Sequence, residues 1–228
     1  MKYLASDYFS RLFQISSQIK VTSRDGKALG LDEGVLRVVR ELTYVKRHRR
    51  KVLLIGNGGS HSIVSHLAAD LQEGLGVRAM VFAEGTRITA LSNDYGYDNA
   101  FDHQFKQWLD PKDLVIAISS SGQSQNIINA VEGALRMEAR VVTMSGFRSD
   151  NPLRSLGLLN LYVPSESYGQ VELAHGMLAH YLSDTGAELI HNPESSEVQS
   201  WEEPEEDEKP SYHSSKRGRW VRRSGTRS

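Results

Sequence analysis

The hydrophobic rhythm of the chain changes after Lys51, and this change restricts the fold more than any other feature. Beyond it, short aliphatic or β-branched runs alternate with stretches of helical periodicity. Strands that alternate with helices form a parallel sheet covered on both faces, so the sequence predicts an α/β fold. The predicted strands are residues 52–55, 79–82, 114–118, 141–144 and 159–163.

The segments on either side of this region have different compositions. Residues 1–50 predict two N-terminal helices, and we assign both to an oligomerisation segment, because the first has a stripe more apolar than a monomer would leave exposed. Residues 191–228 contain few aliphatic residues, an acidic block and a basic block, which predicts a disordered charged tail. Residues 51–190 remain as a single core domain. The apolar stripe consists of Leu4, Tyr8, Leu12, Ile15 and Ile19.

The balance of charge favours a small polar ligand over a polyanion. The chain has 27 Lys and Arg against 28 Asp and Glu, so no overall field attracts it to nucleic acid or to an anionic membrane. The basic end of the tail, around Trp220, could contact nucleic acid or protein, but the adjacent acidic block competes for its charges. The longest aliphatic run, residues 52–55, is far below a membrane span, and the first residues lack a signal-peptide core. We therefore expect a cytoplasmic protein without membrane contact.

Two loops of small residues follow predicted strands, at the sheet edge where ligands of such folds collect. The second loop holds Ser119, Ser120, Ser121 and Ser124, directly before a helix predicted over residues 122–137. Hydroxyls and free N–H groups at a helix N-terminus bind an anion without Lys or Arg, which suits a sugar phosphate. The alternative is that the serines only cap the helix, but four serines in six residues make this less favourable.

The first loop reads Gly56-Asn57-Gly58-Gly59-Ser60-His61 and raises the alternative of a dinucleotide site. It keeps two glycines of the G-x-G-x-x-G pattern, but His61 stands where the third glycine would permit close helix packing. The Gly-Lys-Ser/Thr of a P-loop is absent as well. Neither nucleotide fold is our primary interpretation.

Four motifs stand together in a familiar order and spacing. They are Gly56-Asn57-Gly58-Gly59-Ser60, Ser92-Asn93-Asp94-Tyr95-Gly96-Tyr97, Ile118-Ser119-Ser120-Ser121-Gly122-Gln123-Ser124, and Glu172-x-x-His175 with His180. Over roughly residues 1 to 190 the chain thereby resembles bacterial phosphoheptose isomerases, which are sugar isomerase (SIS) domain proteins. The resemblance implies a five-stranded parallel SIS sheet flanked by helices, and a homotetramer with active sites at subunit boundaries. It also implies interconversion of sedoheptulose 7-phosphate and D-glycero-D-manno-heptose 7-phosphate.

The resemblance also implies which residues bind the phosphorylated sugar. For the pair Asn93-Asp94, the residues alone would favour a simple turn, because Asn and Asp stabilise turns locally. The implied substrate-binding residues are Asn57, Gly58, Gly59, Ser60, Asn93, Asp94, Ser119, Ser120, Ser121, Ser124 and Glu172.

An aldose–ketose isomerisation moves a proton between neighbouring carbons, and therefore needs a base and an acid. The resemblance implies that Asp70 is the base, where the family has glutamate, and that His180 is the acid. Without cysteine, a metal must bind to His, Asp or Glu. The resemblance implies one Zn²⁺ per subunit on His66, Asp70, Glu172 and His180, with Glu172 where the family has glutamine. Because eight helical residues span ~12 Å, Glu172 and His180 need extended side chains or different subunits to share an ion.

Two further histidines, His61 and His175, have ordinary interpretations as a surface residue and a packed interface residue. At the level of function, two hypotheses remain. The first is the isomerase, which a carboxylate at Asp70 and the imidazole of His180 favour. The second is a non-catalytic SIS module resembling the proteins that associate with the replication initiator DnaA, which the shortened carboxylate, Glu172 and the charged tail favour.

Overall fold

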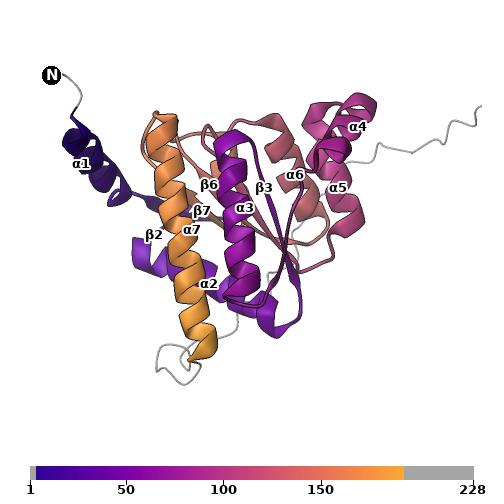
Figure 1. Cartoon of the computed structure of the whole chain (residues 1–228), viewed down its shortest axis with the longest axis horizontal. Helices are drawn as coiled ribbons and strands as arrows, with labels where there is room; N and C mark the ends of the chain where they lie inside the picture. Colours follow the sequence, from indigo (N-terminus) through magenta and orange to yellow (C-terminus); the bar gives the residue numbers. More distant parts are fainter. Residues whose placement is uncertain (1–3, 193–228) are drawn as a thin grey trace, which may run out of the picture.

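The computed structural model describes residues 4–192, and its centre is a sheet in the order β2-β1-β7-β6-β5-β3-β4 (Figure 1). The five strands from β7 to β4 pair in parallel, and each coincides with a predicted strand. The bounds of these five are Lys51–Gly56 (β3), Arg78–Val81 (β4), Leu114–Ser119 (β5), Arg140–Ser145 (β6) and Leu159–Tyr162 (β7).

The expectation of five strands is wrong in number, because the sheet has seven. The two additional strands, β1 (Lys20–Ser23) and β2 (Ala28–Leu29), form an antiparallel hairpin, and β1 also pairs antiparallel with β7. Of the four residues in β1, only Val21 is buried, so this strand lacks the aliphatic run that marked the other five. Ile19, which we assigned to the first helix, directly precedes it.

Helices cover both faces of the sheet. α2, α3 and α7 pack on one face, where they meet Leu54 of β3, whereas α5 and α6 pack on the other face against Leu53. The alternation of neighbouring side chains along a fully buried strand thus supplies both core layers. The helices are α1 (Ala5–Ser16), α2 (Leu31–Arg47), α3 (Gly58–Glu73), α4 (Gly85–Tyr95), α5 (Ala100–Trp108), α6 (Gln125–Arg136) and α7 (Tyr168–His191), with short 3₁₀ helices at Tyr97–Asn99 (η1) and Pro152–Ser155 (η2).

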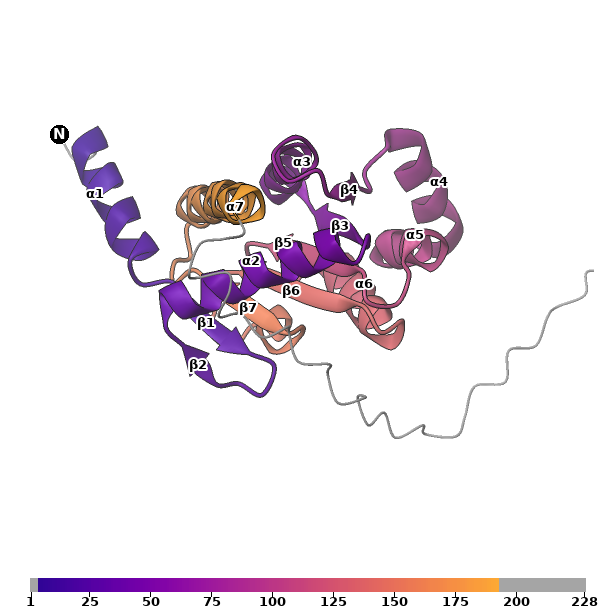
Figure 2. The same cartoon turned by 90° about the horizontal axis from the view of Figure 1, so that it is seen from below.

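The two helices of the predicted N-terminal segment differ in how they are packed. Figure 2 shows α1 standing away from the rest of the molecule, and none of its residues is buried. Phe9 and Phe13 are 65% and 72% exposed. By contrast, α2 contributes Val38, Val39 and Leu42 to the main core. Of these two helices, α1 is the one that leaves large apolar side chains exposed for contact with another chain.

Within residues 4–192, no helix has the length and apolar character needed to cross a membrane. The predicted tail, residues 191–228, lies outside the described residues except for its first two.

Candidate active site

The two predicted loops meet at the carboxyl ends of the strands, because each loop follows one of the parallel neighbours β3 and β5. Across this junction the Ser60 hydroxyl lies 3.4 Å from that of Ser120. The side-chain amides of Asn57 and Asn126 also exchange two hydrogen bonds, of 2.9 and 3.0 Å. The glycine loop and the serine loop therefore form a single site.

The serine loop has the geometry of an anion site. Ser119 and Ser120 are buried, the Ser119 hydroxyl donates to Ser124 Oγ at 3.1 Å, and the Gln123 N–H donates to Ser121 Oγ at 3.2 Å. The loop leads into α6, which begins at Gln125, so hydroxyls and the positive end of the helix dipole share one location. This arrangement suits a phosphate group.

Glycine is required at one point of this loop. Gly122 has φ +64°, in the left-handed region, and a Cβ there would overlap the side-chain amide of Asn151. This backbone turn also explains why α6 begins three residues later than predicted.

Sequence reasoning missed two polar residues that hold the glycine loop. Besides the bonds between Asn57 and Asn126, the Tyr97 hydroxyl donates to Asn57 Oδ1 at 2.8 Å. The position of Asn126, an asparagine in the first turn of the helix after the serine loop, is the sequence signal that could have indicated it. Nothing in the local pattern distinguishes Tyr97.

Asn93 and Asp94 lie in the last turn of α4, so the turn that we considered for them is instead helix. Both side chains are exposed, and Asn93 donates to Asp94 Oδ1 at 3.0 Å. The helix ends at Tyr95, and the next residue, Gly96, has φ +80°.

The other predicted residues lie on α3 and α7, which run side by side in parallel (Figure 1). Three contacts fix their register. Gly59 faces Glu172, the Ser183 hydroxyl lies 3.5 Å from Asp70 Oδ2, and a Cβ on Gly74 would lie 3.8 Å from that of Ala187. The two residues of each pair are the same number of positions apart in the sequence. The two helices therefore run in the same direction and keep a constant register.

This register brings His66, Asp70 and His180 together. Asp70 Oδ2 lies 3.5 Å from His66 Nε2 and 3.7 Å from His180 Nδ1, and one ligand atom from each residue lies within 4.8 Å of the others. The two imidazole side chains are 61% and 57% exposed, and the carboxylate is 29% exposed. Bonds of ~2.0–2.1 Å place zinc ligands roughly 3.4 Å apart, so small side-chain movements would fit this triad to one ion.

Glu172 does not join the triad within one chain. Its carboxylate lies against Gly59 in the first turn of α3, so closely that a Cβ on Gly59 would overlap it. His180 is eight residues further along α7, ~12 Å along the axis. A single chain therefore offers three of the four predicted ligands.

The triad is also remote from the serine loop. Ser60 touches the loop, and Asp70 follows ten residues later on the same helix, ~15 Å along its axis. The chain thus separates the predicted phosphate loop, at the carboxyl ends of the strands, from the triad of His66, Asp70 and His180 on α3 and α7.

The two further histidines lie outside the triad. His175 is fully buried, and burial lowers its pKa to about 4, while its Nε2 lies 3.2 Å from the Ser145 carbonyl oxygen. His61 is half-buried, with its Nε2 at 3.2 Å from the Ser65 hydroxyl. The interpretation of His61 as a surface residue fits its partial exposure. The interpretation of His175 as an interface residue is wrong, because its side chain is buried inside its own chain.

Comparison with known proteins assigns this arrangement to a family. A profile of the SIS domain matches residues 29–146. A phosphoheptose isomerase from Thiobacillus denitrificans is 32% identical over 187 residues, which cover 78% of this chain and 92% of that protein. The chain belongs to the phosphoheptose isomerase family. A solved phosphoheptose isomerase from Francisella tularensis superposes with a TM-score of 0.71 at 25% identity, covering 80% of this chain and 96% of that one. A second, from Neisseria gonorrhoeae, gives the same TM-score and coverage at 24% identity and supports the fold.

Proposed function

We propose that the chain is an aldose–ketose isomerase that interconverts sedoheptulose 7-phosphate and D-glycero-D-manno-heptose 7-phosphate. The observation that carries the proposal is the pairing of an anion loop at the start of α6 with a carboxylate–imidazole triad, in a phosphoheptose isomerase family member. The relatives described above are named for isomerase activity, which favours the enzyme over the binding module.

The separation between loop and triad supports a site built from two chains. An extended heptose spans roughly 8 Å from C1 to C7 at ~1.5 Å per bond, well short of the ~15 Å between the serine loop and Asp70. A sugar whose phosphate lies on one chain's loop would therefore reach the triad of a neighbouring chain. Exposed apolar side chains suited to such an assembly are Phe9 and Phe13 on α1 and Leu173, Met177 and Tyr181 on α7. We propose a homotetramer on this basis.

In the proposed reaction, Asp70 removes a proton from C1 of the ketose, and the C–H electron pair forms the C1=C2 bond of an enediol. His180 gives a proton to the oxygen on C2. Asp70 then returns its proton to C2, while the hydroxyl on C1 loses its proton to His180 and becomes the aldehyde oxygen. The phosphate stays bound to Ser119, Ser121 and Ser124.

We propose His66, Asp70 and His180 as ligands of one Zn²⁺ per subunit, with Glu172 from a neighbouring chain as a further candidate. A bound zinc ion would polarise the sugar oxygens at C1 and C2 as a Lewis acid. Both histidines face Oδ2 of Asp70, which leaves Oδ1 available for the proton. The donor set is one that other divalent ions also accept.

Proton exchange tests the proposal most directly. We expect the purified protein to exchange the C1 proton of sedoheptulose 7-phosphate with D₂O and to form the aldose, as measured by NMR with and without added Zn²⁺. Asp70→Asn keeps the size of the side chain but removes its basic lone pair, and should abolish exchange while preserving binding. Absence of exchange with every metal would contradict the isomerase, and calorimetric binding of the sugar phosphate without exchange would favour the SIS binding module.

A further inference from the structure

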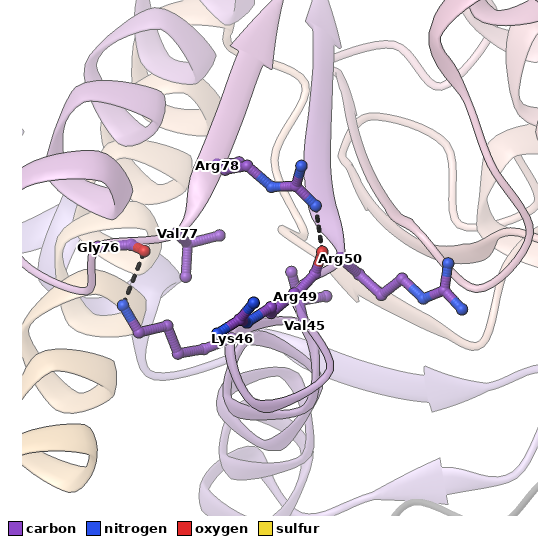
Figure 3. A pocket seen from close by; sticks show the side chains of 7 residues that line it. All are labelled: Val45, Lys46, Arg49, Arg50, Gly76, Val77 and Arg78. Atoms are coloured by element: carbon purple, nitrogen blue, oxygen red, sulfur yellow. Dashed lines mark hydrogen bonds between the residues drawn. The ribbon is translucent and has the colours of Figure 1, made fainter.

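A second concave site lies at the amino-terminal ends of the strands, where β3 and β4 begin (Figure 3). The anion loop follows the carboxyl ends of the strands, so the whole length of the sheet separates the two sites. The second site is a pocket of about 550 Å³, lined by Val45, Lys46, Arg49, Arg50, Gly76, Val77 and Arg78.

Four of the seven lining residues are cations. Lys46 Nζ donates to the Gly76 carbonyl oxygen at 2.8 Å, and the Arg78 guanidinium donates to the carbonyl oxygen of Arg49. Nε of Arg50 is buried without a hydrogen-bond partner. Within residues 4–192, no carboxylate forms a salt bridge with any of the four. The pocket therefore holds uncompensated positive charge.

The carboxylate of Asp110 lies near this positive charge, but it already forms an ion pair with Lys51. Lys51 Nζ lies 2.5 Å from Asp110 Oδ2, and this hydrogen bond, with the charges of Lys51, Arg50 and Arg78, holds the pKa of Asp110 below its ordinary value. Asp110 thus stays ionised, yet it lies outside the pocket lining. The four cations of the pocket lining therefore remain open to an additional anion.

The chain carries suitable anions close to this pocket. Near the end of α7, Ala187 faces Gly74 and Gly186 packs against Leu75, beside the turn that forms one wall of the pocket. The last described residue is five positions beyond Ala187. The next ten residues can span up to ~33 Å, which ends at the first of six carboxylates between residues 202 and 208.

We propose that this acidic segment, residues 202–208, docks in the pocket of Lys46, Arg49, Arg50 and Arg78. Exposed ion pairs are individually weak, but a short tether keeps the segment at a high effective concentration, so that weak pairs together suffice. Docking at this edge leaves the anion loop and the triad uncovered. Added salt weakens the docking, because dissolved ions screen the attraction between solvent-exposed charges.

Cleavage by chymotrypsin after Trp201 provides the test in the full chain. The protease must extend the residues on both sides of the bond in its cleft, and docking of the adjacent acidic segment prevents this. Cleavage after Trp220, beyond the segment, is the internal reference. If nine-tenths of the chains are docked, cleavage after Trp201 is slowed roughly tenfold, because it proceeds from the undocked population.

Three variants separate docking from other causes of protection. Lys46→Glu with Arg49→Glu reverses the pocket, and Glu205→Gln with Glu206→Gln neutralises the segment without altering the described domain. Both should remove the protection, and the second pair keeps the test decisive if the first fails to fold. The matched control is Arg136→Glu with Arg148→Glu, two exposed arginines elsewhere with the same change in charge, which should retain the protection.

The opposite results would overturn the proposal. These are equal rates after Trp201 in the parent and in the segment variant, or equal loss of protection in the control. If inorganic phosphate binds to the pocket in calorimetry while all these rates are equal, the pocket belongs to a free anion and the docked segment is excluded.

Discussion

Replacement of Gly122 by alanine tests whether the serine loop depends on its left-handed turn. An L-residue at φ +64° costs about 1–2 kcal/mol relative to glycine. The new Cβ would also displace Asn151, which is 3% exposed. Asn151 donates to the carbonyl oxygens of Gly146 at 3.1 Å and Arg148 at 2.8 Å, and it accepts from the Arg154 N–H at 3.1 Å.

Loss of one or two of these bonds adds about 1–3 kcal/mol, so Gly122→Ala should lower the free energy of unfolding by about 2–5 kcal/mol. Urea unfolding at one fixed protein concentration measures this change. Gly176→Ala is the matched control, because its added Cβ meets nothing within 4 Å and alanine favours the interior of α7, with an expected gain of ~0.5–1 kcal/mol. A loss below ~1 kcal/mol for Gly122→Ala, or an equal loss in both variants, would refute this reasoning.

Four further outcomes are expected. If a short base limits turnover, Asp70→Glu raises kcat with little change in KM, whereas a fall in zinc content and kcat would instead show that the longer side chain crowds the metal site. Ser119→Ala removes a phosphate-binding hydroxyl and should raise KM about tenfold or more, since hydrogen bonds to charged groups contribute ~1.5–3 kcal/mol; an unchanged KM would contradict its role. Deletion of residues 1–17 should yield smaller species in sedimentation, and an intact tetramer would contradict the assignment of α1. Because the folded-state pKa of His175 lies below its ordinary value, the unfolded chain binds more protons under acid conditions. Urea unfolding should therefore show full stability above about pH 6.5 and a progressive loss towards about pH 4, and His175→Gln should flatten this dependence.

The fold was largely predictable because each central strand is buried on both faces and reads as an aliphatic run. The hairpin was not, because β1 buries only Val21 and takes its stability from pairing with β7, a contact between distant parts of the sequence. The assignment of α2 to an oligomerisation segment also depended on context. Its apolar stripe packs against the chain's own sheet, a partner that periodicity does not identify.

The candidate site shows the same division between local and distant information. The spacing of His66 and Asp70 predicts that they share one helix face, and they do. The approach of His180, and the absence of Glu172 from the group, follow from the register between α3 and α7. That register depends on how both helices pack on the sheet, and no motif in either helix encodes it.

The register between the parallel helices α3 and α7 determines where the side chains of the triad lie. The serine loop, by contrast, takes its position from the strand that precedes it. In the proposed reaction, substitutions of the triad residues would therefore alter proton transfer and leave phosphate binding unchanged. In the proposed isomerase, affinity for the sugar phosphate and the rate of turnover would thus depend on different parts of the fold and could change independently of each other.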